Sequence, residues 1–139
     1  MSHNVGFAFQ KLAFSLLRRS DELLQSKLGI GYAQYKLLEV LAEHPNSSQR
    51  FVASALMQTE ASISRQVKLM QAAGLLRVGT PAENKRVRVI SLSSKGSELH
   101  AKAAGILNQC YMSYFNGLSA SESEAFARIV SKLDSTRIY

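Results

Sequence analysis

Residues 47–92 read SSQRFVASALMQTEASISRQVKLMQAAGLLRVGTPAENKRVRVISL, and this stretch decides the fold. In its first part, apolar residues recur at steps of three and four, which is typical of amphipathic helices. The spacing predicts a short helix over 49–56 and a longer one over 60–73. Two short helices joined by a tight turn form a helix-turn-helix unit.

Small polar residues and a glycine mark the ends of these two helices. Ser47 or Ser48 is a candidate N-cap for the first helix, and Thr59 for the second, because a side-chain oxygen can accept hydrogen bonds from free N–H groups. Gly74 stands where a helix commonly ends in a left-handed residue.

The apolar period changes after the second helix. Residues 75–78 and 85–92 are rich in β-branched side chains, which predicts two strands, and 79–84 is a loop too long for a tight turn. A ribbon that follows a helix-turn-helix is the wing of a winged helix.

The remainder of the chain is predicted to be helical, so the fold class is mainly α with a small two- or three-stranded β-wing. We expect a winged helix-turn-helix region at 31–93 and a helical dimerisation region formed by 1–30 and 94–139, within one compact domain. The flanking helices are expected over 4–25, 32–43 and 93–118, and from Ser119 or Ser121 onward with Phe126, Ile129, Val130 and Leu133 facing inward.

The charge is strongly positive and unevenly distributed. Seventeen Lys and Arg face ten Asp and Glu, a formal net charge of +7. Between Ala61 and Lys95, seven cations face one anion, Glu83, so nearly all of the excess lies in the second helix and the ribbon. A charge run is often only a solvated surface, but these two elements of a winged helix face DNA. Double-stranded DNA is therefore the predicted partner.

Groove geometry indicates which residues would contact DNA. An α-helix fits the major groove, where Arg65 could bind guanine and Ala61 could touch a thymine methyl group, while Lys68 is better placed for phosphate. In the ribbon, Arg86 could enter the minor groove. The full predicted set is Ser48, Gln49, Thr59, Glu60, Ala61, Ser62, Ser64, Arg65, Lys68, Asn84, Lys85, Arg86 and Arg88.

Three segments together resemble the MarR family of winged-helix regulators: SSQRFVASALMQTEASISRQVKLMQAAGLL, GTPAENKRVRVISLSSKG and GLSASESEAFARIVSKL. The resemblance implies a homodimer, DNA binding through residues 60–73 and 79–88, and a wing arginine at Arg86. The sequence departs from the family pattern at two places. Asn84 stands where the family has an aspartate that helps hold this arginine. Gln66 and Leu69 have the reverse of the polar and apolar character usual at their positions.

A two-fold dimer predicts a pseudo-palindromic operator with half-sites about 10 bp apart. The resemblance further implies a transcriptional regulator, a repressor by expectation, which a small aromatic or phenolic effector releases from DNA. The residues expected at the dimer interface are Phe9, Leu12, Leu16, Leu107, Tyr111, Tyr114, Phe115, Phe126, Ile129 and Leu133.

Three alternative functions place different demands on the sequence. A redox-responsive regulator would use the single cysteine, Cys110, which lies on an apolar stripe without a cation among its helical neighbours. A winged helix used only for protein contacts would not need so basic a wing. An enzyme is not expected, because no catalytic motif appears and His100 has no acidic residue three or four positions away on its helix.

The sequence predicts no cofactor and no metal site, because the histidines are scattered and one cysteine cannot form a Cys-based zinc site. Nothing in it approaches the run of about 20 apolar residues that spans a bilayer, and the start lacks the features of a signal peptide. We therefore expect no membrane association and a cytoplasmic location.

Overall fold

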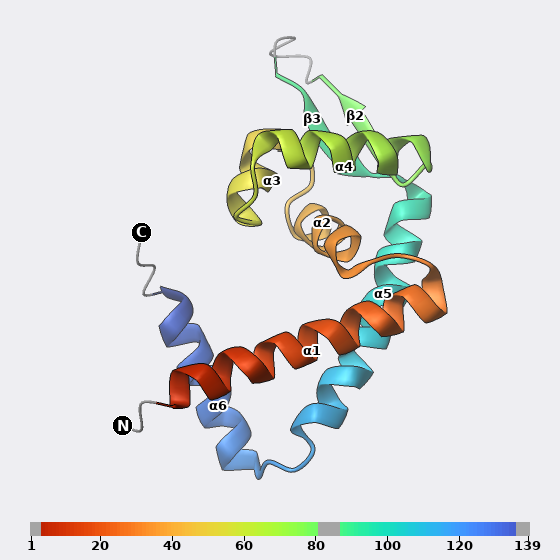
Figure 1. Cartoon of the computed structure of the whole chain (residues 1–139). Helices are drawn as coiled ribbons and strands as arrows, with labels where there is room; N and C mark the ends of the chain where they lie inside the picture. The colour runs from red at the N-terminus through yellow and green to blue at the C-terminus, as the bar shows by residue number, and fades with distance from the viewer. Residues whose placement is uncertain (1–3, 81–86, 136–139) are drawn as a thin grey trace. The chain divides into compact units, whose positions relative to one another are not determined.

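Six helices and three short strands make up residues 4–80 and 87–135, the part of the chain that the computed structural model describes (Figure 1). In chain order they are α1 (Val5–Leu28), α2 (Tyr32–Glu43), β1 (Ser47–Ser48), α3 (Gln49–Ala55), α4 (Glu60–Ala72), β2 (Leu76–Gly79), β3 (Val89–Leu92), α5 (Ser94–Phe115) and α6 (Ala120–Ser135).

The three strands form one antiparallel sheet in the order β1-β3-β2. Leu76 pairs with Leu92 and Gly79 with Val89, so β2 and β3 are a hairpin that extends past α4 (Figure 1). The third strand is only two residues long, and its Ser47 pairs with Ile90. The predicted fold class, mainly α with a small β-wing, is confirmed, and the sheet has three strands.

The predicted bounds were wrong at three places. Among the described residues, the second hairpin strand begins at Val89, whereas we expected it from residue 85; residues 85 and 86 lie outside the described part. The long helix ends at Phe115 and not near Leu118. The first helix continues to Leu28, where Gly29 ends it with a left-handed φ of 68°.

The side-chain caps of the two middle helices are as predicted. Ser48 Oγ accepts a hydrogen bond from the N–H of Phe51 at 3.1 Å, and Thr59 Oγ1 accepts one from the N–H of Ser62 at 3.1 Å. Between Ser47 and Ser48, the structure selects Ser48 as the cap, because its hydroxyl accepts the bond from Phe51, whereas the hydroxyl of Ser47 donates to His44 O at 2.6 Å.

Contacts between Cα atoms divide the chain into two units, residues 1–107 and 108–139. In the first unit, the core consists of apolar side chains from α1, α2, α3, α4, β3 and α5. Those with almost no exposed surface are Leu24, Leu37, Leu38, Leu41, Val52, Ile63, Met70, Ile90, Ala103 and Leu107. This core holds α4 and the hairpin in fixed positions relative to α2.

The turn after α4 packs directly against the start of α5. The N–H of Ser93 donates to Leu75 O at 3.0 Å, and Lys95 Nζ donates to Ala73 O at 3.0 Å. A Cβ added at Gly96 would lie 2.1 Å from Leu75 O, so only glycine permits this approach. We call these contacts the α4–α5 junction.

In the second unit, α6 begins with a capping box. Ser119 Oγ accepts a hydrogen bond from the N–H of Glu122 at 3.2 Å, and Glu122 Oε1 accepts one from the N–H of Ser119 at 2.9 Å. The expectation that the apolar residues of α6 face inward is wrong for the chain alone. No residue of α6 is buried, and Leu133 is 60% exposed.

Candidate nucleic-acid interface

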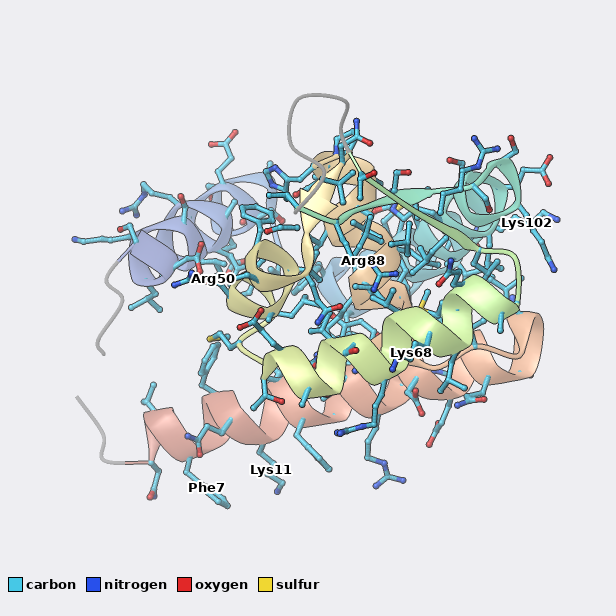
Figure 2. All side chains as sticks on the ribbon, turned by 90° about the horizontal axis from the view of Figure 1, so that it is seen from above. Phe7, Lys11, Arg50, Lys68, Arg88 and Lys102 are labelled. Atoms are coloured by element: carbon cyan, nitrogen blue, oxygen red, sulfur yellow. The ribbon has the colours of Figure 1, made fainter. Side chains whose placement is uncertain are left out.

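The outer side of α4 carries basic and small residues together with one leucine. Ile63, Val67 and Met70 are buried against the core, so the helical repeat turns the opposite side of α4 to solvent. Exposed on that side are Ala61, Arg65, Lys68, Leu69 and Ala72. Figure 2 views the first unit from the side of α4 and the hairpin, with Lys68 on α4 and Arg88 by the hairpin.

The residues predicted to contact DNA fall into three groups. Exposed among them are Thr59, Glu60, Ala61, Arg65, Lys68 and Arg88, and partly buried are Ser48, Gln49, Ser62 and Ser64. Asn84, Lys85 and Arg86 lie outside the described residues.

Several of the partly buried members also make bonds within the helix-turn-helix. Gln49 Nε2 donates to Glu60 O at 3.3 Å, which links the start of α3 to the start of α4. The hydroxyl of Ser62 donates to Gln58 Oε1 at 3.2 Å. The oxygens of the caps Ser48 and Thr59 are engaged as well, so these four side chains position the two helices in addition to any contact with DNA.

Four basic residues of this surface are not engaged by a carboxylate in the described part of the chain. Within residues 4–80 and 87–135, Arg65, Lys68, Arg77 and Arg88 take part in no ion pair, and all four are exposed. Uncompensated cations on one face attract a polyanion at long range. Lys95 differs from them, because its ammonium group caps the carbonyl of Ala73 at the negative end of the α4 dipole.

Sequence reasoning missed an additional basic residue, Arg50. It is exposed on α3 and labelled in Figure 2. The signal was available, because Arg50 directly follows the predicted contact residues Ser48 and Gln49.

Sequence reasoning also missed a polar contact between α2 and α5. His100 Nε2 lies 2.6 Å from Glu39 Oε2, and the hydroxyl of Tyr35 donates to the same carboxylate oxygen at 2.9 Å. The hydrogen bond from His100 lowers the pKa of Glu39; burial opposes this, and the bond from Tyr35 lowers the pKa further. The acidic partner of His100 is therefore on another helix.

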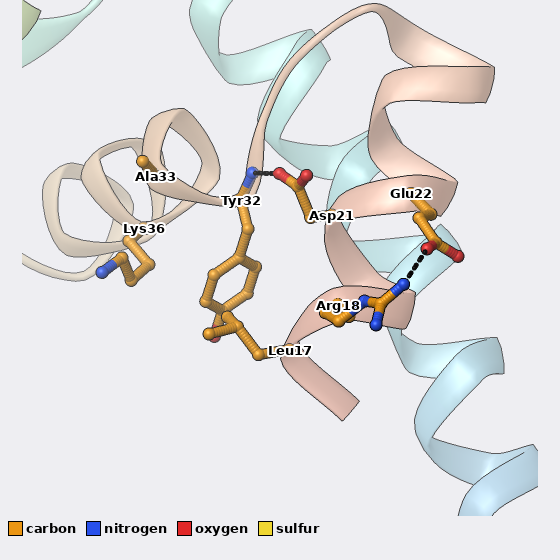
Figure 3. A pocket seen from close by; sticks show the side chains of 7 residues that line it. All are labelled: Leu17, Arg18, Asp21, Glu22, Tyr32, Ala33 and Lys36. Atoms are coloured by element: carbon orange, nitrogen blue, oxygen red, sulfur yellow. Dashed lines mark hydrogen bonds and ion pairs between the residues drawn. The ribbon is translucent and has the colours of Figure 1, made fainter. Parts of the chain in front are cut away.

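A cavity of about 370 Å³ lies between α1 and α2 (Figure 3). Its size is within the range of small-molecule sites. Asp21 Oδ1 accepts a hydrogen bond from the N–H of Tyr32 at 2.8 Å. Arg18 Nη2 and Glu22 Oε1 form an ion pair at 3.6 Å. The ring of Tyr32 forms the aromatic wall of the cavity, and the Lys36 ammonium lies 5.8 Å from the centroid of this ring. The cavity thus offers aromatic surface together with charges of both signs.

The residues predicted for a dimer interface are mostly uncovered. Phe9, Leu12, Phe126, Ile129 and Leu133 are each between 39% and 60% exposed. Tyr114 is also exposed, and Leu16, Tyr111 and Phe115 are partly buried. Leu107 is different: it is fully buried in the core of its own chain, so it has no surface left for a partner.

In the second unit, an apolar cavity of about 570 Å³ lies beside the exposed residues of α6. The ring centroids of Phe115 and Phe126 in its wall are 5.2 Å apart. Cys110, the residue of the redox alternative, is buried.

Among residues 4–80 and 87–135, no helix combines the length and apolarity needed to cross a membrane. Nor do three or more His, Cys, Asp or Glu side chains gather there as a metal site would require.

This chain is similar to known proteins in both sequence and structure. The family model of the MarR family matches residues 28–87. The transcriptional regulator HosA of Escherichia coli O157:H7 is 29% identical over 103 residues, which cover 74% of this chain and 76% of HosA.

Two solved structures share the fold. MepR of Staphylococcus aureus, in a complex with DNA, superposes with a TM-score of 0.82 at 21% identity, covering 96% of this chain and 98% of MepR. BpsR of Bordetella bronchiseptica, whose DNA binding is regulated by 6-hydroxynicotinic acid, superposes with a TM-score of 0.83 at 20% identity. The match covers 99% of this chain and 97% of BpsR. Residues 28–87 thus match the MarR family, HosA is similar to the chain over 103 residues, and the two solved structures share its winged-helix fold.

Proposed function

We propose that this chain is a homodimeric transcriptional regulator, a repressor by expectation, that binds a pseudo-palindromic DNA operator. In this proposal α4 lies in the major groove and the wing, residues 79–88, lies in the minor groove. The observation that carries it is the set of cations that are exposed and form no ion pair among the described residues of α4 and the hairpin, led by Arg65 and Lys68. The DNA complex of MepR and the name of HosA support the same function.

Selection of bound duplexes from a random pool tests this proposal. A specific operator should emerge with two related half-sites about 10 bp apart, and its affinity should fall steeply with salt as counterions are released. Arg65→Ala should weaken binding, whereas Lys102→Ala, which removes an exposed cation on α5, should not. A protein that retains no duplex at low salt would refute DNA binding and favour a protein-interaction module.

The dimer part of the proposal rests on uncovered apolar surface. Clusters of exposed large apolar side chains are uncommon in monomers, and α1 and α6 both carry several such side chains. Ile129→Glu should therefore separate the subunits, whereas Arg128→Glu, which changes an exposed residue outside the apolar stripe of α6, should not. Sedimentation of Ile129→Glu beside Arg128→Glu measures this, and a wild-type chain that sediments as a monomer would contradict the dimer.

The effector part of the proposal assigns a small aromatic or phenolic acid to the cavity between α1 and α2. Tyr32 would stack on its ring and the ammonium of Lys36 would pair with its carboxylate. 6-Hydroxynicotinic acid, to which BpsR responds, is a suitable first probe. Release of the operator by this acid or related aromatic acids should be reduced in Lys36→Gln, and unchanged release would place the site elsewhere.

The redox alternative makes a different prediction. Burial of Cys110 argues against it, because buried thiols react slowly with oxidants. Peroxide should therefore leave DNA binding intact. The redox regulator would be favoured if peroxide abolished DNA binding by wild type, a reductant restored it, and Cys110→Ser were unaffected. The cytoplasm remains the expected location.

A further inference from the structure

Two positions of α4 have the reverse of the usual helix polarity. Gln66 is partly buried and its Nε2 donates to Gln58 Oε1 at 2.9 Å, so a polar side chain occupies the inner side. Leu69, by contrast, is 71% exposed. A single exposed leucine is ordinary on a protein surface, so its meaning depends on where it lies.

Leu69 lies on the outer side of α4, in one row with Ala61 and Arg65. These three residues are four positions apart, which places their side chains along one inclined ridge of a helix, and all three are exposed. Lys68 belongs to the neighbouring row. When one ridge meets the base edges of a major groove, the neighbouring row is closer to a phosphate backbone, which suits the charge of Lys68.

The chemistry of leucine restricts what it can recognise in that groove. It has no hydrogen-bonding group, and the one apolar group on the major-groove edge of the base pairs is the C5-methyl of thymine. The rise of about 1.5 Å per residue separates Arg65 from Leu69 by about 6 Å, or roughly two base-pair steps of about 3.4 Å.

We infer that Leu69 is a specificity-determining residue, which selects thymine about two base pairs from the base that Arg65 contacts. This inference rests on the proposed function, because it assigns one base preference within the DNA site. It also gives the exchanged polarities a physical reason: Gln66 bonds to Gln58 inside, and Leu69 has an apolar partner outside.

The experiment removes the thymine methyl group and nothing else. Each thymine of the selected operator is replaced in turn by deoxyuridine, in both half-sites, and the Kd is measured for wild type, Leu69→Ala and Gln71→Ala. Gln71 is an exposed α4 residue outside the row and serves as the matched control. Loss of one buried methyl group should weaken wild-type binding about fourfold per half-site, or roughly 15-fold for both.

The inference is supported if deoxyuridine at one symmetric pair of thymines weakens binding by wild type and by Gln71→Ala to this extent. The same replacement should then leave the affinity of Leu69→Ala unchanged. It is overturned if Leu69→Ala is as sensitive to deoxyuridine as wild type, or if wild type tolerates every replacement. Both of these results leave specific DNA binding intact, so the proposed function survives them. Absence of any specific operator would overturn the inference together with the proposed function.

Discussion

The α4–α5 junction allows a quantitative test, the substitution Gly96→Ala. The new Cβ would lie 2.1 Å from the carbonyl oxygen of Leu75 and 3.1 Å from its carbon, whereas real Cβ contacts are essentially never below 3.0 Å. The atoms that it meets belong to the backbone, and the N–H of Ser93 donates to the same oxygen. No side chain can therefore rotate away, and the junction itself must open by about 1 Å.

The expected cost follows from two opposing effects. Overpacking in a filled interior destabilises a protein by about 1–3 kcal/mol, and an unyielding backbone contact belongs at the upper end. Alanine recovers about 0.8–1.0 kcal/mol over glycine inside a helix. We expect a net loss of about 2 kcal/mol, which at a slope of roughly 2 kcal/mol/M lowers the urea midpoint by about 1 M.

Gly105→Ala is the matched control, because Gly105 lies on the same helix and its added Cβ would meet nothing within 4 Å. It should stabilise the protein by about 0.5–1 kcal/mol. Urea unfolding of both variants at one protein concentration, followed by circular dichroism, measures the difference. A Gly96→Ala protein as stable as wild type would refute the close approach. Reduced operator affinity in folded Gly96→Ala would further indicate that the junction positions α4.

Four further predictions concern DNA recognition, pH dependence and helix capping. Arg65→Ala should cost about 1–3 kcal/mol at one base position in a binding scan of operator variants; a uniform loss over all sequences would assign this residue to phosphate. Arg86→Ala should weaken binding and reduce the preference for A/T-rich flanks, and unchanged affinity would show that the wing arginine is misassigned. Because its bond to His100 lowers the pKa of Glu39, the stabilising contribution of this carboxylate is present above its ordinary value of 4.5 and is lost as pH falls through the lowered pKa. Wild type should therefore be more stable than Glu39→Gln near neutral pH, by no more than about 1 kcal/mol for so accessible a pair, and a difference that fails to shrink in acid would argue against this contact. Ser119→Ala should destabilise the first turn of α6 by about 1 kcal/mol, measured as faster amide hydrogen exchange there, and unaltered exchange would mean that the capping box contributes nothing.

Local features of the structure were readable from the sequence. Helix α2 was predicted at residues 32–43, as observed, because the proline after His44 disfavours further helix. The caps Ser48 and Thr59 were predicted because each bonds an N–H only three residues away. The basic character of α4 and the hairpin was also evident, since charge depends on composition alone.

The remaining features depend on residues that are distant in sequence. Strand β1 has only two residues and exists because β3 offers it hydrogen bonds. Glu39 and His100 are 61 residues apart, so no helical spacing could pair them. The capping role of Lys95 likewise required its approach to the end of α4.

The sequence by itself determined the order of the helices, their caps and the sign of the DNA-facing charge, because hydrogen bonds and apolar contacts between near neighbours favour them locally. Only the tertiary structure decided which apolar residues are covered: Leu107 is inside, while Leu69 and Leu133 are exposed. Periodicity shows that a helix has an apolar side, but what packs against that side depends on the path of the whole chain.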